Sequence, residues 1–293
     1  MFSGSIVALV TPMEADGAIN YAQLQRLIDF HVDQGTDALV IAGTTGESAT
    51  LEHAEHVELI ERSCEFAAGR MPIIAGTGSN STAQTLRLST AVDKLGVAGL
   101  LIVTPYYNKP TQQGLALHFA HIADAVSVPV ILYNVPGRTA VDLLPQTAVE
   151  LARHGNICGI KEATADLDRV KLIRDGAGED FDLLSGDDAT CCEFMLLGGD
   201  GVISVTANVA PRAMHEMCAA ARAGLRDEAE RIDAALQPLH EKLFLESNPI
   251  PVKWAVSRMG LMSDGIRLPL TALSGDFHAS VLEAMDSASV EHE

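Results

Sequence analysis

The sequence predicts a (β/α)8 barrel of the TIM type followed by a C-terminal helical extension. Short apolar runs begin at residues 5, 38, 72, 99, 129, 157, 181 and 201. Most of these runs do not alternate with polar residues, which is typical of strands that are buried on both faces of a parallel sheet. Eight units spaced about 30 residues apart are typical of the barrel. A doubly wound sheet is the alternative, but it rarely needs eight such regular units.

The expected elements alternate along the first two-thirds of the chain. The expected strands are Ser5–Pro12, Ala38–Gly43, Pro72–Gly76, Gly99–Pro105, Pro129–Asn134, Ile157–Lys161, Phe181–Gly186 and Gly201–Val205. Amphipathic helical stretches lie between them, including Tyr21–Gln34, Leu51–Ala68 and Ser81–Lys94.

The barrel should close near residue 225. We therefore expect a barrel domain with the active site at 1–225 and a helical region at 226–293 that packs on it, because no low-complexity linker separates the two. The longest expected helix of this region is Glu228–Leu245, which should be kinked or interrupted at Pro238.

Composition excludes several classes of protein. The chain has 293 residues, of which 47% are hydrophobic, so it is not a disordered chain. A net charge of −19 repels phosphate backbones and anionic membrane surfaces, so neither nucleic acid nor a membrane is an expected partner. No apolar run is long enough to span a membrane, and the N-terminus does not resemble a signal peptide. Five cysteines form no CxxC pair, which favours a cytoplasmic location.

Lys161 is the most unusual residue at the strand ends, where the active sites of such barrels form. It lies inside an apolar strand, in the segment GIKEAT. Burial should favour the neutral amine, and a neutral amine attacks a carbonyl group to form a Schiff base. The alternative is a strand-end lysine whose amine reaches solvent, and position alone does not decide between the two.

Tyrosines are concentrated near this lysine. Tyr133 lies on the preceding strand, where its phenol could relay a proton during imine formation or simply fill the barrel rim. Tyr106, Tyr107 and Tyr133 are three of only four tyrosines, and they lie on two neighbouring strand ends. That concentration favours a function.

Two further loops could bind carboxylates. Thr44 and Thr45 offer hydroxyl and backbone N–H groups just before a helix, which suits either a small carboxylate or a capped tight turn. Arg138 follows a Pro-Gly turn, where its guanidinium could pair with a carboxylate in a bidentate manner or be an ordinary surface charge.

No metal or organic cofactor is expected. Several groups offer ligand atoms: His53 with His56, His118 with His121, Asp187 with Asp188, and Cys191 with Cys192. The histidine pairs lack a third ligand, the two aspartates suit helix capping, and adjacent cysteines point in different directions on a helix. The segment Gly76–Gly78 matches no nucleotide fingerprint.

Taken together, these motifs resemble a known family. The segments GTTGES, PYYN, YNVPGRT, GIKEAT, LLSGDD and GVISVTAN, in this order, are similar to those of the dihydrodipicolinate synthase family, which belongs with the pyruvate-dependent class I aldolases and lyases. The likeness runs from SGSIVALVTPM through NPIPVKWA, nearly the whole chain. It implies condensation of pyruvate with L-aspartate-4-semialdehyde to 4-hydroxy-tetrahydrodipicolinate, in diaminopimelate and lysine biosynthesis. It also implies no cofactor, because the protonated imine accepts the electrons.

The resemblance assigns the catalytic residues. The family's Schiff-base lysine corresponds to Lys161, and its proton relay corresponds to Thr44, Tyr107 and Tyr133. In the family, the tyrosine that matches Tyr107 reaches across a dimer interface into the partner's site. The resemblance also implies a homotetramer built from two tight dimers.

The resemblance also assigns the substrate-binding residues. Thr44 and Thr45 match the positions that hold the pyruvate carboxylate, and Arg138 matches the arginine that binds the carboxylate of the second substrate. Gly186 and Ile203 match backbone positions that line the pocket.

An inhibitory lysine site is implied as well. Its matching residues are Ser48, Ala49, His53, His56, Asn80, Gln84 and Tyr106. Relatives that are sensitive to lysine often have Glu where this chain has Gln84. Loss of that charge should weaken binding of an ammonium group, so we expect lysine to inhibit with lower affinity than in Glu-bearing relatives.

Two other functions remain as alternatives. One is a sister lyase on the same scaffold that cleaves N-acetylneuraminate or a 2-keto-3-deoxy sugar acid. Such lyases share the lysine and tyrosine but do not need the arginine, so Arg138 favours the synthase. The other alternative is a non-catalytic regulator or binding protein, which would form no imine.

Overall fold

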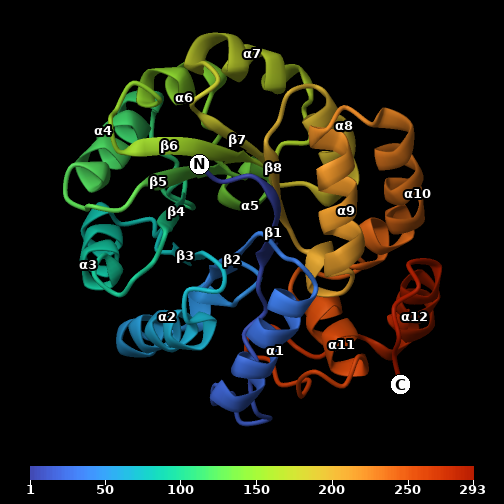
Figure 1. Ribbon diagram of the computed structural model, residues 1–293. Helices are drawn as coiled ribbons and strands as arrows, with labels where there is room; N and C mark the ends of the chain where they lie inside the picture. Colours follow the sequence, from blue (N-terminus) through green and yellow to red (C-terminus); the bar gives the residue numbers. More distant parts are fainter.

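Eight parallel strands close into a barrel in the computed structural model, which describes residues 1–293 (Figure 1). They follow one another in chain order, and β8 pairs with β1 to complete the ring. The strands are β1 Gly4–Ala8, β2 Ala38–Ile41, β3 Ile73–Gly76, β4 Gly99–Val103, β5 Val130–Asn134, β6 Ile157–Glu162, β7 Asp182–Ser185 and β8 Gly201–Ser204. The predicted (β/α)8 fold is confirmed, and each strand lies at one of the apolar runs.

Helices surround the barrel and continue beyond it. They are α1 Tyr21–Asp33, α2 His53–Ala67, α3 Thr82–Val92, α4 Gln112–Ala123, α5 Pro136–Thr139, α6 Pro145–Leu151, α7 Asp168–Ala177, α8 Cys191–Leu196, α9 Pro211–Arg222, α10 Arg226–Lys242, α11 Ile250–Arg258 and α12 His278–Ser287, with 3-10 turns η1 Ser48–Thr50, η2 Asp188–Thr190, η3 Thr206–Asn208 and η4 Gly275–Phe277. Polar side chains cap several starts; Asn20, for example, accepts a hydrogen bond from the backbone N–H of Gln23. No helix combines the length and the apolar character that crossing a membrane requires.

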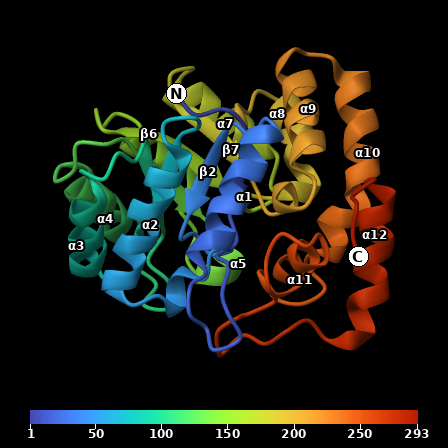
Figure 2. The same cartoon turned by 60° about the horizontal axis from the view of Figure 1, so that its bottom comes forward.

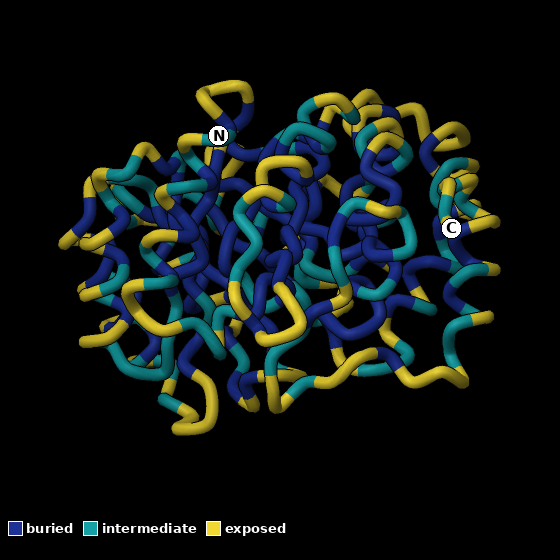
Figure 3. The backbone as a smooth tube through the Cα atoms, turned by 90° about the horizontal axis from the view of Figure 1, so that it is seen from below, coloured by how far each residue is buried: buried dark blue, intermediate teal, exposed yellow.

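The hydrophobic core has two layers, one on each face of the sheet. A cluster of 12 buried residues, including Ile6, Val40, Ile131 and Leu184, fills the inside of the barrel. A cluster of 63 buried residues lies mainly between the outside of the barrel and the helices. Buried backbone accordingly runs through the centre of the molecule in Figure 3. Because both faces of each strand are buried, the strand sequences are nearly continuous apolar runs.

The C-terminal helices pack on one side of the ring. In Figures 1 and 2, α10 and α12 lie side by side outside α8 and α9. Pro238 does not interrupt the helix, since α10 continues through this residue, while the expected kink stays a prediction. A proline removes only one backbone donor, and packing against α8, α9 and α12 outweighs that loss. The domain boundary at residue 225 stays a prediction.

A buried ion pair connects the C-terminal region to the barrel. Lys253 on α11 donates to Glu47, which lies in the turn after β2, and both side chains are almost fully buried. The second Glu47 oxygen accepts a hydrogen bond from the backbone N–H of Arg267 at 3.1 Å. Burial lowers the pKa of Lys253, while the Glu47 carboxylate opposes that shift. The turn after β2 is therefore fixed from the outside by α11 and the segment that follows it.

We predict that Lys253→Met strongly destabilises the fold, because it leaves the Glu47 carboxylate buried without a partner. The expected loss is about 3–5 kcal/mol of the free energy of unfolding, measured by urea denaturation at fixed protein concentration. The control is Lys171→Met, which breaks an exposed pair with Asp175 and should change the free energy by less than ~1 kcal/mol. If Lys253→Met unfolds at the same urea concentration as the parent and the control, the buried pair does not stabilise this turn.

Candidate active site

A cavity of about 180 Å³ opens at the carboxyl end of the barrel. Its wall is built from the strand ends and the loops that follow them, together with two residues of the C-terminal region, Phe244 and Asn248. The polar residues on the wall include Thr44, Thr45, Tyr133, Arg138, Lys161 and Asn248. The structure therefore brings together residues from β2, β5, β6 and the C-terminal region.

Lys161 faces this cavity from inside the barrel. It lies on β6 directly opposite Tyr133 on β5, and only 6% of the residue is exposed. Its amine nitrogen lies 4.3 Å from the centre of the Tyr133 ring. The amine forms no ion pair with a carboxylate. The side chain is enclosed by the barrel, and its amine opens onto the cavity rather than onto the outer surface.

Gly186 provides the space for the Lys161 side chain. A Cβ atom at this position would lie 2.9 Å from Cε of Lys161 and 2.6 Å from Cβ of Ala163. Both distances are shorter than real Cβ contacts, so a side chain here would force Ala163 or the lysine stem to shift. The glycine after β7 thus leaves space for the lysine stem in its present position.

The Thr44–Thr45 turn presents two hydroxyl groups next to the lysine. The residues flanking the turn, Ala42 and Glu47, adopt left-handed φ angles of 54° and 58°. The Thr45 hydroxyl accepts a hydrogen bond from the Asn248 side chain at 3.0 Å, which leaves its own proton available for a ligand. The Asn248 side-chain oxygen is buried and has no hydrogen-bond partner.

Arg138 supplies the positive charge at the cavity mouth. It lies on the short helix α5, and its guanidinium donates a long hydrogen bond of 3.4 Å to the backbone oxygen of Asn248. It forms no ion pair with any carboxylate of the chain, whereas Arg169 and Arg174 both do. A guanidinium without a carboxylate partner is well suited to bind an anionic substrate.

Two predicted residues do not reach the cavity within one chain. Tyr107 is 87% exposed and has a left-handed φ of 74°, so its phenol lies on the outer surface. Ile203 belongs to the core inside the barrel. Val205, which follows β8, lines the cavity in its place. Asn248 lines the cavity, but sequence reasoning treats it only as part of a break between two helices. The one sequence feature that could have indicated its role is a polar residue directly before Pro249.

A second cavity of about 520 Å³ adjoins the first. Six of the seven residues of the predicted lysine site line it: Ser48, Ala49, His53, His56, Gln84 and Tyr106. Asn80 is not on this wall, although its backbone oxygen accepts a hydrogen bond from Asn108. Thr44 and Arg138 line both cavities, so a ligand in the second cavity would contact residues of the first.

The wall of the second cavity carries hydrogen-bond acceptors together with two arginines, Arg87 and Arg138. The Nε2 atom of His56 lies 2.8 Å from the Gly76 carbonyl oxygen, which accepts only, so this nitrogen carries the proton. Burial lowers the pKa of His56, which keeps the ring neutral and leaves Nδ1 as an acceptor. Glu52 is the only carboxylate on the wall.

Comparison with known proteins identifies the family. The model of the dihydrodipicolinate synthetase family matches residues 1–288. A protein of Ectopseudomonas mendocina (strain ymp) named 4-hydroxy-tetrahydrodipicolinate synthase is 58% identical over 290 residues, which are 99% of each chain.

Solved structures agree in fold and sequence. The chloride-inhibited dihydrodipicolinate synthase of Acinetobacter baumannii, complexed with pyruvate, is 50% identical with a TM-score of 0.98, covering 99% of this chain and all of that one. The enzyme of Cyanidioschyzon merolae with lysine bound is 39% identical with a TM-score of 0.96, covering 99% of each chain. This chain therefore belongs to the dihydrodipicolinate synthetase family, the family that its motifs resemble.

Proposed function

We propose that this protein condenses pyruvate with L-aspartate-4-semialdehyde to give 4-hydroxy-tetrahydrodipicolinate. The observation that carries the proposal is the Lys161 amine, which faces the cavity beside the Tyr133 ring and near an arginine with no carboxylate partner. We also propose a cytoplasmic location, which the five free cysteines favour.

The reaction starts on Lys161. Its amine attacks the ketone of pyruvate, and loss of water gives a protonated imine. Loss of a methyl proton gives an enamine, whose carbon attacks the aldehyde of the second substrate. The amine of that substrate then displaces Lys161 and closes the ring. Tyr133 and Thr44 line the same cavity and would relay protons during imine formation.

Two carboxylates need separate partners in this cavity. We assign the pyruvate carboxylate to the Thr44–Thr45 turn, where the Thr45 hydroxyl has a proton to donate. We assign the semialdehyde carboxylate to Arg138. Gly186 keeps space for the lysine stem, and the backbone role of Ile203 stays a prediction.

Arg138→Ala should lower kcat/KM for the semialdehyde by about 10–100-fold, the usual effect of losing a hydrogen bond to a charged group. The KM for pyruvate should change little, because pyruvate binds to other residues. A coupled assay measures both constants, and Arg222→Ala, which removes an exposed arginine from α9, is the control. Normal turnover of Arg138→Ala, or cleavage of N-acetylneuraminate by the parent, would favour a sister lyase instead.

We further propose that Tyr107 acts in the site of a partner subunit within a dimer, and that two dimers form a tetramer. The exposure of Tyr107 supports this, since a catalytic phenol that is exposed in one chain needs a partner chain to become enclosed.

Mixing two inactive variants tests whether Tyr107 acts in the partner's site. Lys161→Ala and Tyr107→Phe should each have little activity. After the two are mixed, unfolded and refolded together, each mixed dimer should contain one complete site, with Lys161 from one subunit and Tyr107 from the other. If mixing restores no activity while each variant still forms dimers, Tyr107 does not act across the interface.

We propose that lysine binds the second cavity and inhibits. The neutral His56 ring and Glu52 support binding of an ammonium group, and the lysine-bound relative shows that a member of the family binds this ligand. The shared wall residues Thr44 and Arg138 offer a route from this cavity to the active site.

Gln84→Glu should strengthen lysine inhibition, because it adds a carboxylate to the wall. A gain of about 1 kcal/mol for a partly exposed pair corresponds to roughly fivefold lower inhibitory concentration. The control is Gln25→Glu, which adds the same charge to an exposed position of α1. Equal inhibition of both variants would exclude Gln84 from the lysine site. A rate of the parent that is unchanged by about 10 mM lysine, a concentration equivalent to roughly 3 kcal/mol of binding, would exclude inhibition itself.

A further inference from the structure

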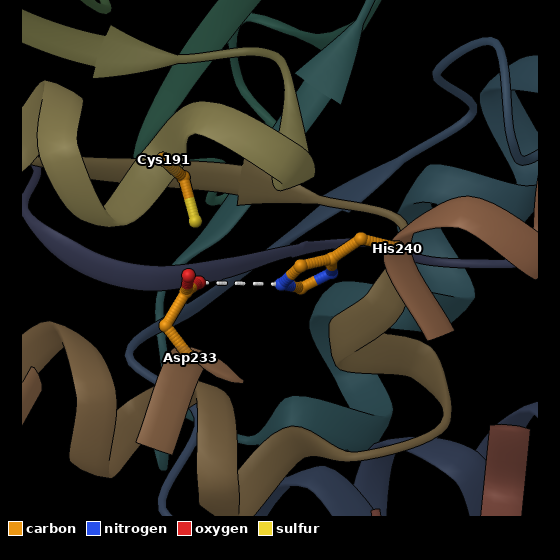
Figure 4. A group of neighbouring side chains, drawn as sticks. All are labelled: Cys191, Asp233 and His240. Carbon is orange, nitrogen blue, oxygen red and sulfur yellow. Dashed lines mark ion pairs between the residues drawn. The ribbon is translucent and has the colours of Figure 1, made fainter. Parts of the chain in front are cut away.

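Three side chains with metal-binding donor atoms lie close together between α8 and α10, outside the active-site cavity. Cys191 begins α8, and Asp233 and His240 lie seven residues apart on α10, on the same face of the helix. The thiol sulfur, a carboxylate oxygen and a ring nitrogen all lie within 4.8 Å of one another. Figure 4 shows the three side chains pointing toward a common centre. None of them lines the active-site cavity.

Two of the polar atoms in this cluster lack hydrogen-bond partners. His240 is 3% exposed, and its Nε2 forms no hydrogen bond, nor does Oδ1 of Asp233. The two atoms face each other at 3.5 Å, longer than an ordinary N–H···O bond. Buried polar atoms without partners are rare in native proteins, and such atoms often serve as ligands of a bound ion.

The only basic side chain paired with the carboxylate of the cluster is His240 itself. Asp233 accepts a hydrogen bond from the side chain of Gln237, and neighbouring Asp188 accepts from two backbone N–H groups. Neither carboxylate forms an ion pair with a lysine or arginine. A cation at the centre would stabilise both the carboxylate and the thiolate.

The histidine is oriented for coordination. Its other ring nitrogen, Nδ1, lies 2.8 Å from the hydroxyl oxygen of Thr206, the first residue of η3 after β8. When Nδ1–H donates to this oxygen, Nε2 carries a lone pair that faces the cluster. A hydrogen bond of this kind to the second ring nitrogen is the usual support of a metal-bound histidine.

We propose that Cys191, Asp233 and His240 form a binding site for a divalent transition-metal ion. One thiolate, one carboxylate and one imidazole suit Zn²⁺, with water as a fourth ligand. Tetrahedral Zn²⁺ places its donors about 3.5 Å apart, the separation already present between Asp233 and His240. Binding displaces the thiol proton of Cys191 to solvent. The ion would tie α10 to α8, and it revises the sequence-based expectation that the chain has no metal site.

Metal titration of the purified full-length protein tests this proposal. After treatment with a chelator and dialysis, the protein is titrated with Zn²⁺ and, separately, with Co²⁺. We expect one tightly bound ion per chain by elemental analysis, a higher melting temperature with Zn²⁺, and a sulfur-to-cobalt charge-transfer absorption with Co²⁺. Cys191→Ala should lose this absorption and bind at least tenfold more weakly.

Cys192→Ala is the matched control, because it removes the adjacent buried thiol, which is not in the cluster. It should keep the stoichiometry and the absorption. Asp233→Asn, which preserves size, provides a second test and should also weaken binding at least tenfold. The proposal is overturned if the parent retains no ion, which would leave only a histidine–aspartate pair. It is equally overturned if Cys191→Ala and Asp233→Asn bind Zn²⁺ as the parent does.

Discussion

The contact between the Lys161 side chain, the Tyr133 ring and Gly186 is the feature on which the rest of the site depends. Three neighbouring strand regions meet there: β5 carries the tyrosine, β6 the lysine, and the turn after β7 the glycine. A closed parallel barrel gathers these strand ends at one mouth. Because a Cβ at the glycine would collide with the lysine stem, the glycine leaves the space in which the amine lies beside the ring and opens onto the cavity.

The C-terminal region completes this site. Asn248 donates to the Thr45 hydroxyl and accepts from Arg138, so it joins the two groups that we assign to the two carboxylates. Lys253 fixes Glu47, at the end of the same turn. The region beyond the barrel thus holds these two groups in place, and stability of this region should be needed for activity.

Much of this arrangement was predictable from local sequence. Buried strands appear as apolar runs, and a lysine within one, Lys161, stands out by its chemistry alone. The pairing of Glu47 with Lys253 was not predictable, since 206 residues separate them and neither belongs to a periodic pattern. In the sequence, the nearest possible metal ligand to Cys191 is its neighbour Cys192, and adjacent cysteines make a poor ligand pair. The side chains that the fold brings close to Cys191 are Asp233 and His240 on α10. The position of Tyr107 relative to a partner chain depends on assembly, which local patterns do not encode.

Reductive trapping of pyruvate tests whether the Lys161 amine is the nucleophile. The protein is incubated with pyruvate and borohydride, digested and analysed by mass spectrometry. We predict one adduct, on the peptide that contains Lys161, and its absence from Lys161→Ala. An unmodified chain, or an adduct on a different lysine in its place, would contradict the claim that this buried amine holds the keto acid covalently.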